Sequence, residues 1–175
     1  LASTGNATDF GNDFENLRVG PAGCSSSTRG VLAGGLSESS VQYNNIRYIT
    51  IASTGNTTDF GNLTSTSQDD GNGSSSTRGL FSGVGSSATN NGINYITIAS
   101  TGNATNFGNL TVSRRYHEGS SSKTRAITAA SNYNELYKVD YVEISTTGNA
   151  TDFGDLTVGR SGSTGVSNAH GGIAA

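Results

Sequence analysis

The stretch of sequence that decides the fold is Ala-Ser-Thr-Gly-Asn-Thr-Thr-Asp-Phe-Gly, residues 52–61. Near-identical copies begin at Ala2, Ala99 and Ser145, and the first glycines of successive copies lie 50, 47 and 46 residues apart. Self-similarity with a period of about 20–50 residues is typical of repeat architectures. The chain is therefore predicted to be a single repeat domain, with units at 2–51, 52–98 and 99–144 and a partial unit at 145–175.

Two other features recur with the same period. The block Ser-Ser-Ser-Thr-Arg-Gly at 25–30 returns at 74–79 and, altered, at 120–126. A tyrosine precedes the phenylalanine of the deciding stretch by 12 residues three times, as Tyr48 precedes Phe60. These fixed distances indicate that every unit repeats the same local structure.

Each unit of about 47 residues is predicted to form four short β-strands. One covers residues 29–35, and the next is Tyr-Ile-Thr-Ile at 48–51, where alternation of side chains puts Ile49 and Ile51 on one face. A Gly-Asn turn follows, because both residues tolerate a positive φ. A third run ends near Leu63, and the Ser-rich segment supplies the last strand. The expected fold class is all-β.

The composition excludes several classes of protein. The chain has 25 Gly, 26 Ser, 22 Thr and 18 Asn among 175 residues, with only 32% apolar and 13% charged residues. No run approaches the roughly 18 apolar residues of a membrane-spanning helix, so no membrane insertion is expected. Charge is too sparse for a coiled coil. A net charge of -3 gives no nucleic-acid footprint.

The ends of the chain and its single cysteine say little about its compartment. Cys24 alone excludes an intrachain disulfide framework and a multi-cysteine metal site. The chain starts at Leu1 and has no Met, which indicates a processed product, a fragment or part of a larger protein. No targeting segment is visible at the start.

The units resemble kelch-like β-propeller repeats, which carry a Gly doublet, a Tyr, a later aromatic residue and a basic residue. Gly34-Gly35, Tyr48 and Phe60 stand at the first three positions, and Arg114 and Arg160 stand where such repeats often carry Arg. Later units depart from the pattern, since Gly83-Val84-Gly85 and Ala130-Ser131 replace the doublet and Ser67 replaces the Arg.

The amino-acid sequence of the units also resembles tandem repeats predicted in marine phage and environmental virus structural proteins. The two resemblances imply a repeat platform in a viral structural protein, and the four copies of the Gly-Asn turn make about 3.5 four-stranded β-propeller blades. Propellers close with about 4–8 blades. The chain is therefore expected to be part of a larger propeller, or an open array completed by neighbouring chains, in preference to a small closed ring.

No catalytic, cofactor or metal site is predicted. His117 and His170 lie in different units and have no counterparts in the others, and nothing places a nucleophile beside an oriented base. Asp9 and its copies recur, but the third copy has Asn106. A calcium loop relies on several carboxylates, so these residues are interpreted as turn caps. The chain is expected not to be an enzyme.

The Asn-x-Thr pattern allows two interpretations. Such sequons accept N-linked glycans in a secreted protein of a suitable host. A Gly-Asn-Ala-Thr turn copied four times carries its sequon with it for structural reasons alone. The candidate glycosylation positions are Asn6, Asn56, Asn103 and Asn149.

The recurring Arg29, Arg78 and Arg125 also have two interpretations. They either tie neighbouring strands, the preferred interpretation, or form a basic ring for anionic sugars. Recognition is expected where the units differ, because variable loops on a fixed scaffold carry binding in repeat proteins. The candidate recognition residues are Glu38, Gln68, Asp70, Arg114, Arg115, Tyr116, His117, Tyr133 and Tyr137.

Taken together, the sequence predicts a non-enzymatic structural and adhesion module of a virion or extracellular surface appendage, associated with a phage tail or capsid. Its expected partners are other copies of itself or virion proteins, and a host surface glycan or protein used for attachment. The alternative is a self-assembling extracellular filament subunit, in which open repeat ends pair between chains.

Overall fold

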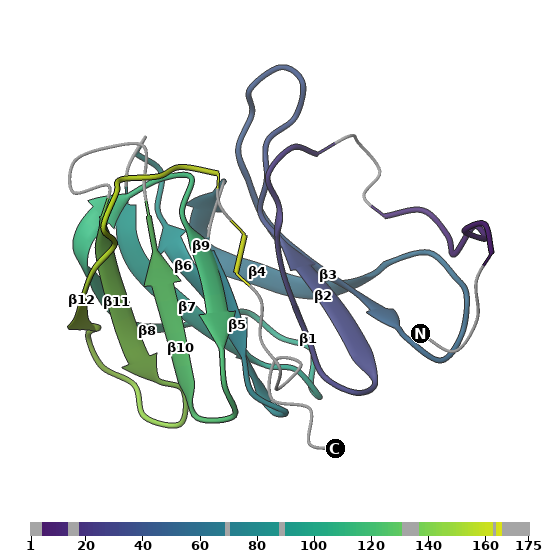
Figure 1. Cartoon of the computed structure of the whole chain (residues 1–175). Coiled ribbons are helices and arrows are strands. Elements are labelled where there is room, and N and C mark those ends of the chain that lie inside the picture. The colour runs from purple at the N-terminus through teal and green to yellow at the C-terminus, as the bar shows by residue number, and fades with distance from the viewer. Residues whose placement is uncertain are drawn as a thin grey trace.

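The computed structural model describes residues 5–13, 18–68, 71–87, 90–130, 137–162 and 164–165. Within these ranges the chain forms β-strands and no helix, so the all-β prediction is confirmed (Figure 1). It follows that the described residues include no helix long and apolar enough to cross a membrane.

The strands form three four-stranded antiparallel sheets, each made of strands consecutive in the chain. The first sheet contains β1 (Ala22–Ser25), β2 (Arg29–Ala33), β3 (Tyr43–Thr50) and β4 (Thr58–Ser67). The second contains β5 (Gly71–Ser74), β6 (Arg78–Val84), β7 (Asn90–Thr97) and β8 (Thr105–Arg114). The third contains β9 (Glu118–Ser121), β10 (Arg125–Ala129), β11 (Lys138–Glu143) and β12 (Thr151–Asp155).

The sheets are out of phase with the units expected from the sequence. The expected unit boundaries at 51/52 and 98/99 fall between the third and fourth strands of a sheet. The Ser-rich segment therefore opens each sheet as its first strand, whereas the sequence had suggested that it ends one.

The repeated tyrosine and phenylalanine meet on neighbouring strands. Their rings are perpendicular within about 10°, with centroids 6.0 Å apart for Tyr48 and Phe60 and 6.0 Å apart for Tyr95 and Phe107. A register shift in the same strand pair accommodates the following glycine, whose φ is +148° at Gly61. The spacing of 12 residues thus places one edge-to-face aromatic pair in each sheet.

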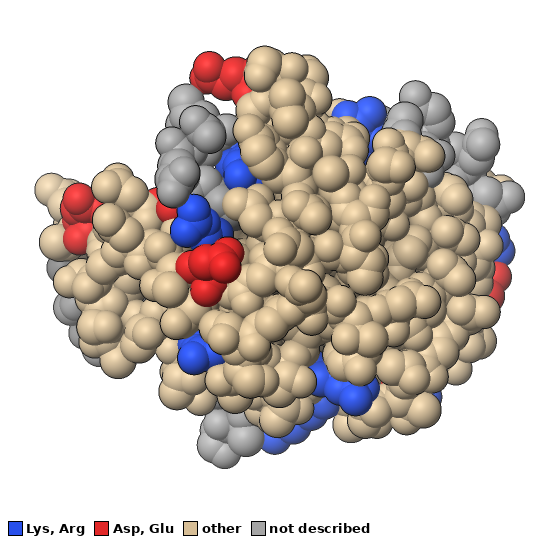
Figure 2. Space-filling view, turned by 180° about the vertical axis from the view of Figure 1, so that it is seen from behind, with Lys and Arg blue, Asp and Glu red and all other residues tan. Residues whose placement is uncertain are grey.

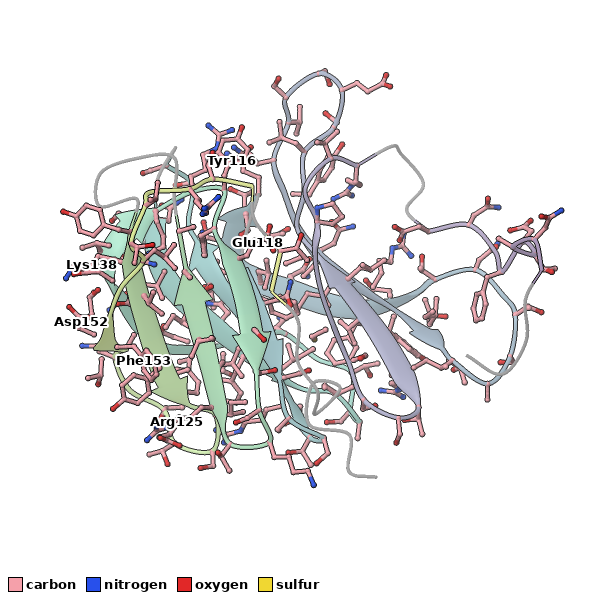
Figure 3. All side chains as sticks on the ribbon, in the orientation of Figure 1. Tyr116, Glu118, Arg125, Lys138, Asp152 and Phe153 are labelled. Carbon is pink, nitrogen blue, oxygen red and sulfur yellow. The ribbon has the colours of Figure 1, made fainter. Side chains whose placement is uncertain are left out.

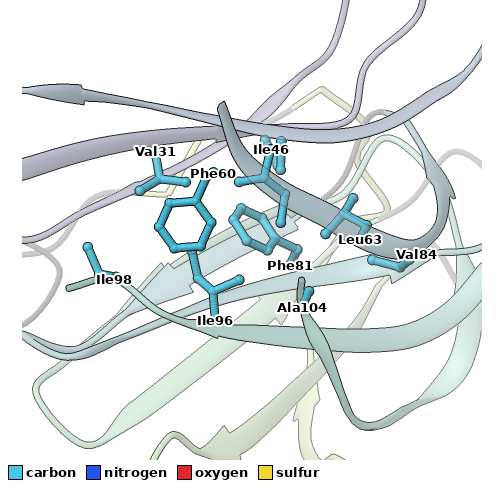
Figure 4. Close-up of a cluster of buried hydrophobic side chains, with 11 residues drawn as sticks. Val31, Ile46, Phe60, Leu63, Phe81, Val84, Ile96, Ile98 and Ala104 are labelled. Carbon is cyan, nitrogen blue, oxygen red and sulfur yellow. The ribbon is translucent and has the colours of Figure 1, made fainter. Parts of the chain in front are cut away.

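Two apolar clusters hold the sheets together. The cluster between the first and second sheets, here called the first interface, includes Phe60, Leu63, Phe81 and Ile98, all buried (Figure 4). The cluster between the second and third sheets, the second interface, has Phe107 at the position of Phe60. Since neither sheet of a pair has a core of its own, neighbouring units stabilise each other, as repeat proteins do.

The Gly-Asn turn before each fourth strand contacts the preceding copy of the deciding stretch. Gly102 N donates to Phe60 O (2.7 Å), and Asn62 N donates to Asn103 Oδ1 (3.0 Å). A Cβ on Gly61 would lie 2.3 Å from the carbonyl oxygen of Gly102. Glycine is therefore required there by close approach of the next copy as well as by its positive φ.

The first strands of the three sheets lie side by side and are linked by serines. Ser74 Oγ donates to Ser25 O (3.2 Å), Ser74 N donates to Ser121 Oγ (3.0 Å), and Ser121 Oγ donates to Ser74 O (3.0 Å). These residues occupy the same position in β1, β5 and β9. The three sheets therefore converge at their first strands.

Candidate recognition surface

Antiparallel topology separates the connections into two groups. In a sheet of consecutive antiparallel strands, successive connections alternate between the two ends of the sheet. The near-identical turns at 26–28, 75–77 and 122–124 therefore share one end with the Gly-Asn turns. The connections that differ between units, such as 34–42 and 115–117, lie at the opposite end.

Five described candidate residues with exposed or half-buried side chains belong to this opposite end, which we call the variable end: Glu38, Gln68, Arg115, Tyr116 and Tyr137. Figure 3 labels Tyr116 near this end and Arg125 at the other. Glu38 and Tyr137 are exposed, and the other three are half-buried. The expected positions Asp70 and Tyr133 lie outside the described residues.

Side chains from two successive connections meet at the variable end. With the Gln68 amide oriented so that its oxygen faces Arg115, this oxygen, after β4, accepts a hydrogen bond from Arg115 Nε (2.9 Å), after β8. The Arg115 guanidinium in turn stacks on the ring of Tyr116, 4.4 Å from its centroid. The variable end is thus a connected surface in which a planar cation and an aromatic ring are held together.

Two of the residues expected on this surface are buried, so the expectation is corrected for Arg114 and His117. Each residue is only 1% exposed. Arg114 Nη2 pairs with Asp140 Oδ2 (2.8 Å) across the second interface, and Arg114 Nη1 donates to Lys138 O (3.0 Å). A buried guanidinium requires such partners, and they come from the neighbouring sheet.

His117 is enclosed beside a serine. Its Nε2 accepts a hydrogen bond from Gly71 N (3.0 Å) and lies 3.0 Å from Ser82 Oγ. Burial, with a smaller effect of Arg114, lowers the pKa of His117 to about 3, so the ring is neutral at ordinary pH.

The contact between Ser82 and His117 does not make a triad within the described chain. A nucleophilic serine needs a base that a third group orients. Nδ1 of His117 has no hydrogen-bond partner among the described residues, and Ser82 is only 5% exposed. Both side chains therefore serve to satisfy buried polar groups between the second and third sheets.

Asp140 is the residue that the sequence analysis missed. It stands at the repeat position of Asn94, and each accepts two hydrogen bonds from a threonine of the preceding sheet. Strand alternation places this position on the face opposite Tyr141. The sequence feature that could have revealed it is an acidic residue directly before a tyrosine that recurs in every unit.

Two of the three repeated arginines tie neighbouring sheets, as the preferred interpretation expected, whereas Arg125 pairs with Glu143 of its own sheet. Arg29 Nη1 donates to Ile98 O (2.9 Å) and Arg78 Nη1 donates to Ile144 O (2.9 Å), in each case on the next sheet. Each guanidinium also stacks on the tyrosine of its own sheet, at 4.4 Å for Tyr48 and 4.6 Å for Tyr95. These contacts do not support a basic ring for anionic sugars.

The sequon asparagines take part in the contact between copies. The Oδ1 atoms of Asn56, Asn103 and Asn149 each accept a backbone N–H from the preceding copy, at 2.9, 3.0 and 3.0 Å. All three residues are exposed, as is Asn6. The turns are therefore explained by structure, and glycan attachment at these positions stays a prediction.

Cys24 packs against the second sheet. Its Sγ packs against the backbone of Gly79, where an added Cβ would lie 2.4 Å away. Burial raises the pKa of the thiol to about 12. Because the thiolate is the reactive form of cysteine, Cys24 acts as a small packing residue at neutral pH.

Charged side chains are sparse on the surface. Figure 2 shows Lys, Arg, Asp and Glu as small separate groups on a face that is mostly uncharged. The described residues contain no group of three or more His, Cys, Asp or Glu side chains that could hold a metal ion. Comparison of the sequence with protein-family models and with curated proteins gave no match.

Proposed function

We propose that the chain is a non-enzymatic adhesion module whose three sheets are blades of a β-propeller. Its variable end binds a glycan or protein on a host surface, and the module belongs to a virion or an extracellular appendage. One observation carries the proposal, namely the separation of near-identical turns to one end of the sheets and differing connections to the other.

That separation supports binding because it divides the residues by role. The repeated Phe, Gly, Asn and Arg side chains contact neighbouring sheets, so their recurrence is explained by packing. The connections at the variable end are not needed for those contacts. Loops held by a rigid scaffold are where recognition residues concentrate.

The serine-linked first strands support the blade geometry. In a propeller, radial four-stranded sheets surround a central channel. Here β1, β5 and β9 line one hollow of about 220 Å³, together with Gly165. Its lining residues are Gly, Ser, Asn and Cys24, which are small enough for three strands to converge.

The composition of the variable end fits a surface for macromolecules. Binding loops of other adhesive proteins combine Tyr, which gives rigid contact area, with Ser, Gly and Asn, which give adaptable hydrogen bonds. These residue types make up eight of the 13 residues in the connections at 85–89 and 130–137, and Tyr137 is 43% exposed. The burial of Ser82 and His117 supports a role without catalysis.

Glycan-array and host-cell binding measurements test the proposal. The double variant Tyr116→Ala/Tyr137→Ala is expected to lose at least about tenfold in affinity, since aromatic anchors dominate binding energies. Ser27→Ala, an exposed change in the turn between β1 and β2, is the matched control and is expected to bind like the unchanged chain. Equal loss in both variants, or no binding to any glycan or cell, contradicts the proposal.

A further inference from the structure

The third sheet carries one half of a contact that is complete elsewhere in the described chain. Three times, the glycine of a Gly-Asn turn donates its N–H to the phenylalanine carbonyl of the preceding copy, at N–O distances of 2.7, 2.7 and 2.8 Å. The donors are Gly55, Gly102 and Gly148. The corresponding carbonyl of the last copy is that of Phe153, on β12.

No described part of the chain covers the surface around Phe153. Its side chain is 60% exposed, whereas Phe60 and Phe107 are each 3% exposed. Gly154 keeps the unusual backbone of its copies, with φ +135°. No atom of the described chain lies within 4 Å of its Cβ position, where the copies meet the carbonyl of the next turn.

The complementary half is bare as well. Gly5-Asn6-Ala7-Thr8 has the same sequence as the turns at 102–105 and 148–151, both of which are docked. All four residues of this turn, Gly5 to Thr8, are exposed. Ala7 is exposed, whereas its counterparts in the docked turns are covered: Ala104 is 8% exposed and Ala150 is half-buried.

We propose that the Phe153–Asp155 segment binds the Gly5–Thr8 turn of a second copy of this chain. Gly5 N would donate to Phe153 O, and Asn6 Oδ1 would accept from Asp155 N, as their copies do within the chain. The main contact uses the backbone N–H of Asp155, and the change from Asn removes only the longer side-chain hydrogen bond (3.5 Å) that Asn109 Nδ2 donates in the copy within the chain. Its side chain lies 3.4 Å from Lys138 Nζ.

Such a contact joins two different surfaces, so it is heterologous. Each bound copy offers the same two halves again, and the assembly closes into a ring or extends as a filament. The occupant is identified by continuity, because this sequence already forms the contact three times with itself. This inference does not depend on what the variable end binds.

Sedimentation velocity over increasing concentration is the first test. The unchanged chain is expected to shift from monomer to larger species, and Gly154→Val is expected to remain monomeric, because its side chain would occupy the site of the incoming carbonyl. Thr151→Val, an exposed change on the same strand, is the control and is expected to associate normally. A chain that stays monomeric throughout, or an unaffected Gly154→Val, overturns the proposal.

Cross-linking of mixed variants tests the pairing itself. In a Cys24→Ser background, Ala7→Cys and Asp155→Cys are each expected to give no dimer alone with a short bis-maleimide. When they are mixed, with a tag on one chain, a dimer containing one of each is expected. No mixed dimer, or dimers of a single variant in equal yield, overturns the head-to-tail contact.

Discussion

The two interfaces use the same geometry with different chemistry. At the first, Asn94 Oδ1 accepts from the N–H and hydroxyl of Thr64, both at 2.9 Å. At the second, Asp140 accepts from the N–H (3.0 Å) and hydroxyl (2.6 Å) of Thr111, and it also pairs with Arg114. The repeat therefore fixes where a buried acceptor sits but not its charge. A charged acceptor at this position comes with a buried countercharge.

Removing the countercharge should have the largest effect. Arg114→Ala leaves Asp140 buried without its ion-pair partner, and we expect a loss of about 4 kcal/mol in the free energy of unfolding. The double variant Arg114→Ser/Asp140→Asn copies the residues Ser67 and Asn94 of the first interface. It should recover most of that loss. Urea denaturation measures both, and a double variant as unstable as Arg114→Ala contradicts the equivalence of the two interfaces.

Lowering the pH should reduce the free energy of unfolding by a smaller amount, and it should act only through His117 at the second interface. The pKa of His117 in the folded chain is about 3, below the 6.5 of an unfolded chain, so the unfolded state alone binds a proton in this window. The free energy of unfolding therefore decreases as the pH falls from 6.5 toward 3, because proton uptake by His117 favours the unfolded chain. The slope is about 1.4 kcal/mol per pH unit, or about 2 kcal/mol between pH 6.5 and pH 5.

His117→Gln removes the titrating group and provides the comparison. Its unfolding free energy, measured from pH 7 to pH 4, should fall less steeply than that of the unchanged chain. Parallel pH profiles for the two proteins would show that His117 is protonated in the folded state.

A still smaller effect is expected from the two threonines that donate to these buried acceptors, Thr64 and Thr111. The loss in the free energy of unfolding should be greater where the acceptor is charged. Thr111→Val removes a hydrogen bond to a carboxylate and should cost about 2 kcal/mol, whereas Thr64→Val removes one to an amide and should cost about 1 kcal/mol. The two substitutions change the same atoms at matched repeat positions. Thermal or urea unfolding of both variants measures the difference, and a larger cost for Thr64→Val would be inconsistent with the charged anchor being the stronger.

The recurring positions of the fold could be predicted from the sequence because their spacing is fixed. The distance from Tyr48 to Phe60 and the Gly-Asn turns led to the all-β class and to four short strands in each unit. The phase could not be predicted, since a continuous repeat has no intrinsic start. Only hydrogen bonding reveals that Ser25 belongs with the strands that follow it.

The candidate recognition surface was only partly predictable. Residues that differ between units were expected at the surface, and this holds for Glu38 and Tyr137. It fails for Arg114 and His117, because two units can differ at a buried position when each satisfies its polar atoms in its own way. Sequence variation between units therefore marks both exposed loops and buried polar pairs, and strand alternation with a partner such as Asp140 separates the two.

The most direct test of the account compares Gly108→Ala with Gly154→Ala. Both glycines follow the repeated phenylalanine and have positive φ, +157° and +135°, so both substitutions strain the backbone. A Cβ on Gly108 would lie 2.1 Å from the carbonyl oxygen of Gly148, whereas no described atom lies within 4 Å of the same position on Gly154.

The central claim is that the repeated residues recur because they hold the next copy. It predicts that Gly108→Ala lowers the unfolding free energy by at least about 2 kcal/mol more than Gly154→Ala, measured by urea denaturation at a concentration where the chain is monomeric. Equal losses would show that the glycine recurs for its backbone conformation alone, and would contradict the claim.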